Sequence, residues 1–247
     1  MEALNVKQYL RSMELKKNEI ESFSKYPFCL PVVRNLEKLE FHPKVTFFVG
    51  ENGSGKSTIL EAIAVALGFN PEGGSINFDF SSRDTHSELY NYIKLIKGVK
   101  RPKDGFFLRA ESFYNFETNL EELDRNVPGM FKYYGGESLH KKSHGESFFA
   151  VFMERFRGNG IYILDEPEAA LSPSRQMAMI VRMHELLKND SQFIIATHSP
   201  ILTAYPDAII YEIKNGIKKV NYEDTENYTV MKSFINDREK MLKWLLK

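Results

Sequence analysis

The chain of 247 residues contains one cysteine, Cys29, which excludes an intramolecular disulfide and a zinc site built from several thiolates. A near-absence of cysteine suits a reducing compartment. The sequence also has no apolar run long enough to span a membrane. Its first twenty residues are charged throughout and lack the apolar core of a signal peptide. We therefore expect a cytoplasmic protein with no membrane span of its own.

Net charge is the second missing feature. The 33 lysines and arginines balance 33 aspartates and glutamates, so no global electrostatic attraction favours nucleic acid or a membrane surface. One basic stretch stands out, at Lys94, Lys97, Lys100, Arg101 and Lys103. It has no stacking aromatics at its centre and is either a solvated face or a nucleic-acid contact. Nucleic acid is therefore a candidate partner that the net charge does not indicate.

What the sequence does contain is a glycine-rich loop, GENGSGKST, at residues 50–58. It follows the apolar run 45–49 and opens a helix-like stretch, 58–67, that Gly68 closes. A strand, a glycine-rich loop and a helix in this order are the context that a phosphate-binding loop requires. The alternative is a chance match of four fixed positions, and the correct flanks weigh against it.

The residue types in this loop suit phosphate chemistry. Glycines let the backbone curl so that N–H groups point at phosphate oxygens, and the helix N-terminus adds partial positive charge. Lys56 is expected to reach the outer phosphates, and the Ser57 hydroxyl to ligate Mg²⁺. The expected phosphate contacts are Gly50, Asn52, Gly53, Ser54, Gly55, Lys56, Ser57 and Thr58.

Two further apolar runs, 161–164 and 192–196, end in polar residues. Because ligands of an open parallel sheet lie beyond the carboxyl ends of its strands, we expect both ends to meet the phosphate loop. Asp165 is then placed to hold Mg²⁺, and Glu166 to act as general base for an attacking water. His198 is placed to contact the γ-phosphate. The alternatives are two solvated loop acids and a structural histidine.

Hydrophobic periodicity gives a coarse map of the elements, which fit a single α/β domain over residues 1–247. Expected helices cover 1–24, 58–67, 147–156, 174–188 and 229–247, with a helical sub-lobe at 113–142. Expected strands cover 32–41, 45–49, 76–81, 106–110, 161–164 and 192–196, and a hairpin joins 208–213 to 217–220. Residues 82–97 fit a strand or a helix equally well.

Three segments, GENGSGKST, IYILDEPEAALSP and FIIATHSP, together resemble an ABC-type ATPase. The resemblance covers about residues 30–215 and is to the soluble branch of SMC proteins and double-strand-break-repair ATPases, often catalogued as AAA-family predicted ATPases. It implies a P-loop NTPase fold with a mostly parallel central sheet, an N-terminal antiparallel β portion and a helical sub-lobe at about 113–145. It also implies Mg²⁺-dependent ATP hydrolysis with Lys56, Glu166 and the switch histidine His198.

The family's signature loop, usually LSGGQ, corresponds to Ser143-His144-Gly145-Glu146. Ser143 and Gly145 keep the hydroxyl and the small residue, which by resemblance cap the γ-phosphate bound to a partner subunit. The resemblance thus implies an ATP-dependent homodimer. Glu111 stands where the family has a glutamine, and it is a candidate Mg²⁺ ligand or water-positioning residue. Tyr26 and Phe28 are candidates for stacking on adenine, with core packing as the alternative for each.

Three functions remain open from the sequence. We favour a soluble ATPase that dimerises around ATP and acts on nucleic acid or on a protein partner. The runner-up is the ATP-binding subunit of an ABC transporter, which the atypical signature loop and Glu111 disfavour. The third is a nucleotide-gated interaction module with negligible turnover, which Glu166 disfavours.

Overall fold

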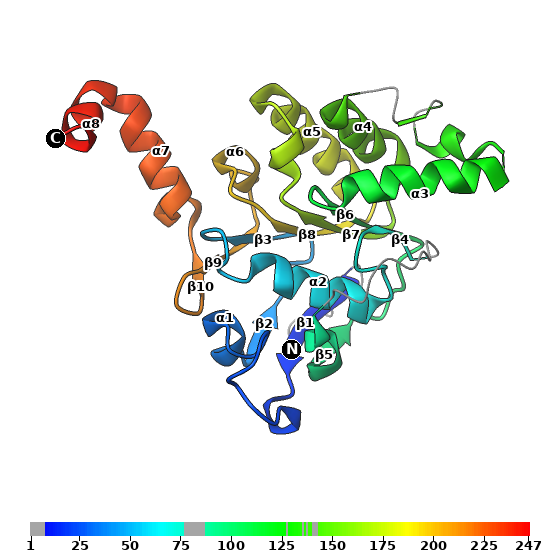
Figure 1. Ribbon diagram of the computed structural model, residues 1–247, viewed down its shortest axis with the longest axis horizontal. Coiled ribbons are helices and arrows are strands. Elements are labelled where there is room, and N and C mark those ends of the chain that lie inside the picture. Colours follow the sequence, from blue (N-terminus) through cyan, green and yellow to red (C-terminus); the bar gives the residue numbers. More distant parts are fainter. Residues whose placement is uncertain (1–7, 77–86, 127, 135, 137, 140–142) are drawn as a thin grey trace.

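The computed structural model describes residues 8–76, 87–126, 128–134, 136, 138–139 and 143–247 (Figure 1). Two β-sheets and a layer of helices make up the body, and two C-terminal helices extend from it. Most of the strand predicted over 76–81 and the start of the ambiguous segment 82–97 lie outside the described residues.

The central sheet has seven strands in the order β10-β9-β3-β8-β7-β6-β4. Its five inner strands are parallel: β3 (Val45–Val49), β6 (Asp104–Arg109), β7 (Gly160–Asp165), β8 (Gln192–Ala196) and β9 (Ile209–Ile213). The short β4 (Gly74–Ser75) and β10 (Ile217–Val220) pair antiparallel at the two edges. All residues of β3, β7 and β8 are buried, as helices on both faces of a parallel sheet require. This sheet confirms the predicted α/β class.

The second sheet is antiparallel, with β1 (Leu10–Leu15) between β2 (Lys38–Glu40) and β5 (Ile93–Lys97). It confirms the predicted N-terminal antiparallel portion. The helix predicted over 1–24 is wrong, because residues 10–15 form a strand that turns Leu10, Met13 and Leu15 into the core. A short 3₁₀ turn, Lys17–Glu19, follows.

The strand predicted over 32–41 is too long. Residues 31–34 form the short helix α1 (Pro31–Arg34), and only 38–40 pair as a strand. Pro31 occupies the first helical turn, where its missing N–H leaves no hydrogen bond unmade. Proline in this position initiates a helix, which the alternating apolar pattern of the segment did not reveal.

Helix α2 (Lys56–Leu67) lies between the two sheets (Figure 1). Its buried residues Ile59, Leu60 and Ile63 share one hydrophobic core with Met13 of β1 and Phe48 of β3. A 3₁₀ segment, Glu88–Tyr92, packs against the same helix and leads into β5. Packing on both sides therefore fixes the helix that begins at Lys56.

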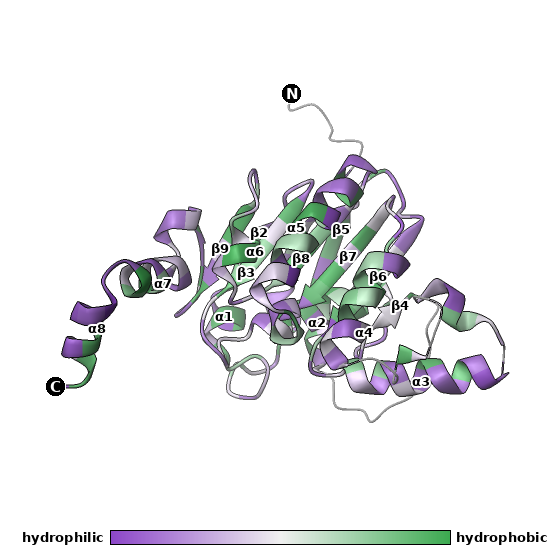
Figure 2. Ribbon diagram, turned by 90° about the horizontal axis from the view of Figure 1, so that it is seen from above, coloured by the Kyte–Doolittle hydropathy of each residue, from purple (hydrophilic) through white to green (hydrophobic). Residues whose placement is uncertain are grey.

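The opposite face of the central sheet is covered by α3 (Phe113–Asn126), α4 (His144–Ala150) and α5 (Pro173–Lys188). The core beneath them is rich in aromatic rings, among them Phe113, Phe148 and Phe156. Figure 2 shows the hydrophobic strands enclosed by helices whose outer faces are hydrophilic. The helix predicted over 147–156 begins earlier, at His144, and ends in a π-helical turn, Val151–Arg155. A 3₁₀ turn, Met130–Tyr133, follows α3.

The hairpin β9–β10 is confirmed, and a 3₁₀ turn, Tyr222–Asp224, follows it. The single helix predicted over 229–247 is wrong: α7 (Glu226–Asn236) and α8 (Arg238–Leu245) are separated at Asp237, whose side chain caps α8. A four-residue helix, α6 (Pro200–Thr203), follows β8. No helix in the described part of the chain has both the length and the apolar character needed to cross a membrane.

Gln192 joins the central sheet to the N-terminal sheet. Its Oε1 accepts hydrogen bonds from the backbone N–H groups of Tyr9 (3.1 Å) and Leu10 (2.8 Å). Its Nε2 donates to the carbonyls of Leu10 (2.8 Å) and His42 (2.9 Å). The side chain is fully buried, so these four bonds satisfy backbone groups that water does not reach.

We predict that Gln192→Ala lowers the free energy of unfolding by about 3 kcal/mol or more, because it leaves several buried backbone groups unpaired. Urea denaturation followed by circular dichroism measures this loss. Lys218→Ala, on the exposed side of β10, is the matched control and should change stability by less than about 0.5 kcal/mol. A Gln192→Ala variant as stable as this control would contradict the role given to Gln192.

Candidate active site

The carboxyl ends of β3, β8 and β7 lie side by side in the sheet. Phe48 pairs with Ala196, and Ala196 pairs with Asp165, so the three ends are level. The polar residues that follow them therefore meet, as the sequence pattern predicted. Ser57 Oγ lies 3.0 Å from Asp165 Oδ1, at the centre of this cluster.

The phosphate loop between β3 and α2 depends on glycine geometry. Gly50, Gly53 and Gly55 have φ angles of 142°, 77° and 98°. A Cβ atom on Gly50 would lie 2.2 Å from the Ile213 carbonyl oxygen, and one on Gly55 would lie 2.5 Å from Val32 Cγ1. The loop therefore needs glycine both for its backbone angles and for its close packing.

Lys56 is the buried cation of the loop. Its Nζ donates to the carbonyl oxygens of Gly50 and Glu51, each at 2.9 Å. Burial lowers the pKa of Lys56, and the neighbouring carboxylates Glu166 and Asp165 oppose that change. The ammonium group is thus held at the mouth of the loop, close to acidic partners.

Ser54 carries a buried hydroxyl that has no hydrogen-bond partner among the described residues. Burying a polar atom without a partner is unfavourable, and the oxygen of a bound anion would relieve it. Asn52 and Gly53 at the loop tip are exposed, so the loop is open to a ligand from solvent. These features fit a phosphate group bound inside the loop.

Asp165 is only 4% exposed, and burial raises its pKa to about 6. Arg109 and the hydrogen bond from Ser57 act in the opposite direction. A hydroxyl and a carboxylate are oxygen ligands of the kind that Mg²⁺ binds, and a cation would offset the unfavourable burial of the charge. The residues present therefore fit Mg²⁺. Within the described ranges, no group of three or more His, Cys, Asp or Glu side chains forms a metal cluster.

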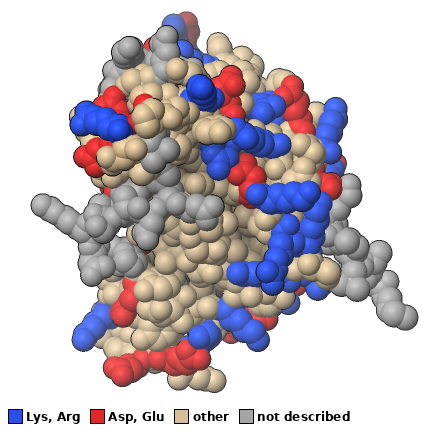
Figure 3. All heavy atoms as spheres, turned by 90° about the vertical axis from the view of Figure 1, so that its right-hand side faces the viewer, with Lys and Arg blue, Asp and Glu red and all other residues tan. Residues whose placement is uncertain are grey.

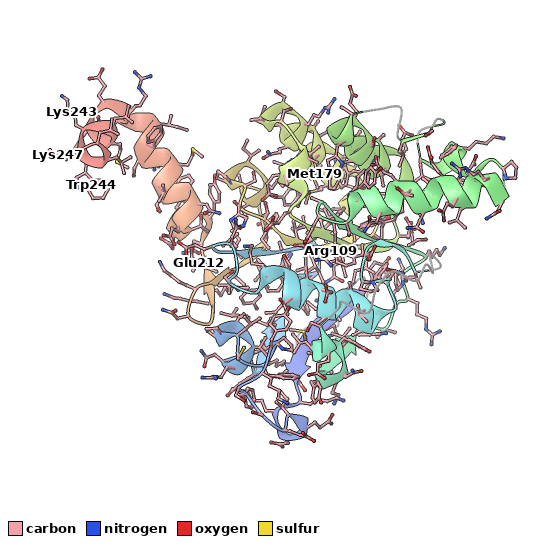
Figure 4. The ribbon with its side chains drawn as sticks, in the orientation of Figure 1. Arg109, Met179, Glu212, Lys243, Trp244 and Lys247 are labelled. Atoms are coloured by element: carbon pink, nitrogen blue, oxygen red, sulfur yellow. The ribbon has the colours of Figure 1, made fainter. Side chains whose placement is uncertain are left out.

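Arg109 is a site residue that the sequence analysis missed. It ends β6 directly beside Asp165, and its Nε lies 3.4 Å from Asp165 Oδ2. Its Nη1 lies 2.8 Å from Glu61 Oε2 on α2, and it also donates to the Pro71 carbonyl at 3.0 Å. Figure 4 labels Arg109 near the centre of the molecule. Its position as the one charged residue of the predicted strand 106–110, next to the end of that strand, was the available signal.

Glu111 does not join the cluster of Ser57 and Asp165. Its side chain is 86% exposed, and its carboxylate lies 3.5 Å from Arg109 Nη2. Arg109 occupies the position beside Asp165 that Glu111 would need. The assignment of Glu111 as a metal ligand stays a prediction.

Glu166 lies between two basic side chains. Its Oε1 is 3.3 Å from His198 Nε2 and 4.0 Å from Lys56 Nζ. Its backbone is in the left-handed region, with φ of 51°, and its N–H donates to the Ala196 carbonyl. This turn directs the side chain away from the strand, toward the loop that follows β8. The site thus combines a half-exposed carboxylate with two groups that can stabilise negative charge.

Glu168 is a second residue that the sequence analysis missed. Its Oε2 accepts a hydrogen bond from Thr197 Oγ1 at 2.7 Å, and its Oε1 accepts one from the backbone N–H of His198. Asn227 of α7 donates to the His198 carbonyl at 2.9 Å. The position of His198 is therefore fixed from both sides. The signal in the sequence was the third acid of the run Asp165-Glu166-Pro167-Glu168.

The signature-like loop begins α4. Ser143 is exposed, and both its N–H and its hydroxyl donate to Glu146 Oε2, at 3.0 Å and 2.7 Å. A Cβ on Gly145 would lie 2.4 Å from the Ala170 carbonyl oxygen, so glycine permits the close approach of α4 to the segment after β7. The contacts described for Ser143 and Gly145 are thus with their own helix and its neighbours. They leave the Ser143 face open to solvent.

The two aromatic candidates for adenine differ in their surroundings. Phe28 is buried and packs edge-on against Tyr92 at 4.9 Å, so it belongs to the core. Tyr26 is 60% exposed, and its hydroxyl lies 3.3 Å from Thr58 Oγ1 at the start of α2. Of the two rings, only that of Tyr26 is available to a ligand.

Two family models match the chain. One, described as an AAA domain, matches residues 17–126, and the other, described as an AAA ATPase domain, matches residues 139–203. The first range contains the phosphate loop. The second contains the signature-like loop, Asp165, Glu166 and His198.

Comparison with individual proteins agrees with these matches. The manganese transport system ATP-binding protein MntB of Bacillus subtilis is 22% identical over 220 residues, which cover 80% of this chain and 82% of that protein. The DNA replication and repair protein RecF of Colwellia psychrerythraea is 30% identical over 128 residues, 44% of this chain and 32% of RecF.

A solved structure of an SMC head bound to the C-terminal winged-helix domain of ScpA shares the fold. Its TM-score is 0.51 at 14% identity, and the match covers 87% of this chain and 99% of that one. At this identity the match shows a shared fold. The two family-model matches and the similar ATP-binding protein show that the chain is a P-loop ATPase of the ABC type.

Proposed function

We propose that this ATPase binds ATP together with Mg²⁺, closes as a homodimer around the nucleotide, and hydrolyses it with Glu166 as the general base. The observation that carries the proposal is the position of the Glu166 carboxylate, between Lys56 and His198 and next to the Ser57–Asp165 pair. A base, two charge-stabilising groups and a cation site within one cluster are the parts that phosphoryl transfer to water needs.

Binding of the triphosphate rests on the phosphate loop. The backbone N–H groups of residues 50–58 surround the phosphates, and the α2 N-terminus favours their negative charge. Lys56 exchanges its bonds to the Gly50 and Glu51 carbonyls for phosphate oxygens. The exposed ring of Tyr26, hydrogen-bonded beside the start of α2, stacks on the adenine.

Ser57 and Asp165 would hold the Mg²⁺ ion. The ion, when bound, offsets charge on the phosphate oxygens. Arg109 keeps Asp165 oriented through its contact at 3.4 Å, and Glu61 holds Arg109 in turn. Glu111, beyond Arg109, is proposed as a further ligand or water-positioning residue if the segment moves when nucleotide binds.

The hydrolytic step uses the chain's own carboxylate. Glu166 accepts a proton from the attacking water as the water oxygen bonds to the γ-phosphorus, and the bond from that phosphorus to the β,γ-bridging oxygen breaks. Lys56 and His198 stabilise the charge that collects on the phosphate oxygens. The hydrogen bond from the backbone N–H of His198 to the Glu168 carboxylate holds the histidine near the γ-phosphate position.

The homodimer supplies the last contacts. Each chain has one phosphate loop and one exposed Ser143 at a helix N-terminus, and the contacts of Ser143 lie within α4. In the proposed dimer, Ser143 and Gly145 of one chain approach the γ-phosphate held by the other, where the helix N-terminus favours its charge. Two composite sites result, related by the two-fold axis.

What hydrolysis drives is a separate question, and we favour a soluble ATPase over a transporter subunit. RecF is named for DNA replication and repair, and MntB for manganese transport. Figure 3 shows a band of Lys and Arg side chains on one face, and Lys103, Arg155 and Arg157 line a groove of about 480 Å³. This basic groove supports a nucleic-acid partner, although Arg155 is already paired with Asp104.

Turnover with and without double-stranded DNA separates these partners. Turnover that rises with DNA favours the nucleic-acid-linked ATPase. Turnover that is indifferent to DNA moves the search to protein partners, membrane proteins included. ATP that binds without being hydrolysed under either condition favours a nucleotide-gated interaction module.

The raised pKa of Asp165 gives a pH dependence. Asp165 must be ionised to hold Mg²⁺, so affinity for MgATP should fall as the pH drops through about 6 and become about tenfold weaker near pH 5 than above pH 7. Calorimetric titration across this range measures the change. ATP itself also titrates, and the Asp165→Asn variant reports that part alone. If the two proteins show the same pH profile, Asp165 does not hold the metal.

Subunit complementation tests the composite site. Lys56→Ala and Ser143→Arg should each be inactive alone, because one lacks the phosphate-binding lysine and the other blocks the partner's site. In a one-to-one mixture, half of the dimers are mixed and each has one intact site, so about a quarter of wild-type turnover should return. The double variant mixed with either single variant is the control. A mixture no more active than its separate components would contradict the shared site.

A further inference from the structure

The last 22 residues, 226–247, form an arm that extends from the body, and we refer to them as the C-terminal arm (Figure 1). No residue of its two helices is buried. Its apolar side chains are nevertheless numerous and exposed: Val230, Met231, Ile235, Leu242, Trp244, Leu245 and Leu246. Helices of eleven and eight residues are marginal in water without packing. Packing of these apolar side chains against another surface would therefore stabilise both helices of the arm.

The root of the arm is fixed to the body. Tyr222 Oη donates to the Pro200 carbonyl at 2.9 Å, Asn227 Nδ2 to the His198 carbonyl at 2.9 Å, and the Glu226 N–H to Glu212 Oε1 at 3.0 Å. Figure 4 labels Glu212 at this root and Trp244 at the far tip. The hydrogen bonds at the root set the direction of α7. They hold α8 away from the body of its own chain.

An apolar groove of about 760 Å³ lies at the root of the arm, between α5, α6 and α7. Tyr228, Met231 and Ile235 of α7 line one side at helical spacing, and Ile180 of α5 and Ile201 of α6 line the other. Met231 and Ile235 are still 47% and 69% exposed. The groove therefore has the apolar lining that an amphipathic helix recognises.

Helix α8 is such a helix. Lys240 and Lys243 share one face, three residues apart, and Lys247 follows the end of the helix. The opposite face is formed by Met241, Leu242 and Leu245, and the two leucines are 36% and 55% exposed. Trp244, 71% exposed, lies at the border of the two faces. One face is thus basic and the other apolar.

The charge of the distal end of the arm is complementary to that of the segment at its root. Residues 238–247 hold four basic residues and one acid, a net charge of +3. Residues 221–227 hold three acids, Glu223, Asp224 and Glu226, and no basic residue, a net charge of −3. Lys214 offsets part of that charge through its contact with Glu226 at 3.2 Å. The eleven residues of α7, about 16 Å long, keep the two ends of one arm apart.

We propose that two copies of the chain pair through their C-terminal arms, antiparallel, with α8 of each copy lying in the groove at the root of the other. Leu242 and Leu245 enter the groove with Trp244 at its rim, and the lysine face of α8 meets Glu223 and Asp224. One two-fold operation buries both apolar surfaces and joins both sets of opposite charges. The pairing needs no nucleotide and is separate from the ATP-dependent contact through Ser143.

A basic amphipathic helix is also typical of segments that lie on anionic membranes. The three acids at the root of the same arm disfavour that occupant, because an anionic surface would repel them. The matching groove further favours a second copy. Lipid binding is therefore an outcome that the experiment must be able to show.

Trp244 is the only tryptophan of the chain, so its emission reports on the arm alone. We expect nucleotide-free protein to sediment as a dimer when its concentration is raised, with a blue shift of Trp244 emission over the same range. Leu245→Glu should abolish both changes. Val99→Glu, at a 77% exposed apolar position outside the arm, is the matched control and should leave both unchanged.

A charge-reversal pair tests the orientation. Lys240→Glu/Lys243→Glu and Glu223→Lys/Asp224→Lys should each weaken dimerisation by about tenfold or more, since each brings like charges together. An equimolar mixture of the two should recover the dimer through one restored contact. Circular dichroism of each variant confirms that α8 is still helical, so that loss of the dimer is not loss of the fold.

Two results would overturn the proposal. One is a monomer at every concentration with unchanged Trp244 emission. The other is a blue shift that occurs only when phosphatidylglycerol vesicles are added, which would assign the arm to a lipid surface. ATP turnover of Leu245→Glu is measured alongside, because turnover tests the proposed function whether or not the arms pair.

Discussion

The site depends on keeping the carboxylate of Asp165 ionised although it is buried. Burial raises its pKa to about 6, so hydrogen-bond donors and positive charges beside it are needed to keep it charged. The Ser57 hydroxyl donates to it, and the Arg109 guanidinium lies beside it with Glu61 holding Arg109 in place. These groups come from α2, β6 and β7, so the parallel order of the sheet is what brings them together. A divalent cation at this point would complete the compensation.

The same part of the molecule links the reaction to distant surfaces. Glu168 joins the loop after β7 to the loop after β8, through Thr197 and the N–H of His198. Asn227 continues this line of hydrogen bonds from the His198 carbonyl into the C-terminal arm. A shift of His198 toward or away from a phosphate would therefore displace Asn227, which is hydrogen-bonded to the His198 carbonyl at the root of the arm. In this way the geometry connects the nucleotide site with the surface on which we propose that a second copy docks.

Much of this arrangement could be predicted from the sequence, because buried parallel strands that end in glycine, acid or histidine have few alternative meanings. The local sequence pattern predicted the wrong secondary structure where contacts with distant parts of the chain determine it. Residues 10–15 form a strand only because β2 and β5 pair with them on both sides. Neither Arg109 nor Glu168 could be recognised from its local sequence, because their importance arises from contacts with Glu61 and Thr197, which are 48 and 29 positions away in the chain. The break at Asp237 was missed because an apolar pattern continues across it.

The central claim is that Glu166 takes the proton from the attacking water, and steady-state ATP hydrolysis by the full chain tests it most directly. The account predicts that Glu166→Gln lowers kcat by about a hundredfold or more, the usual contribution of a general base, while the affinity for MgATP changes by less than about threefold. A Glu166→Gln variant that hydrolyses ATP at a rate near that of the wild type would contradict it.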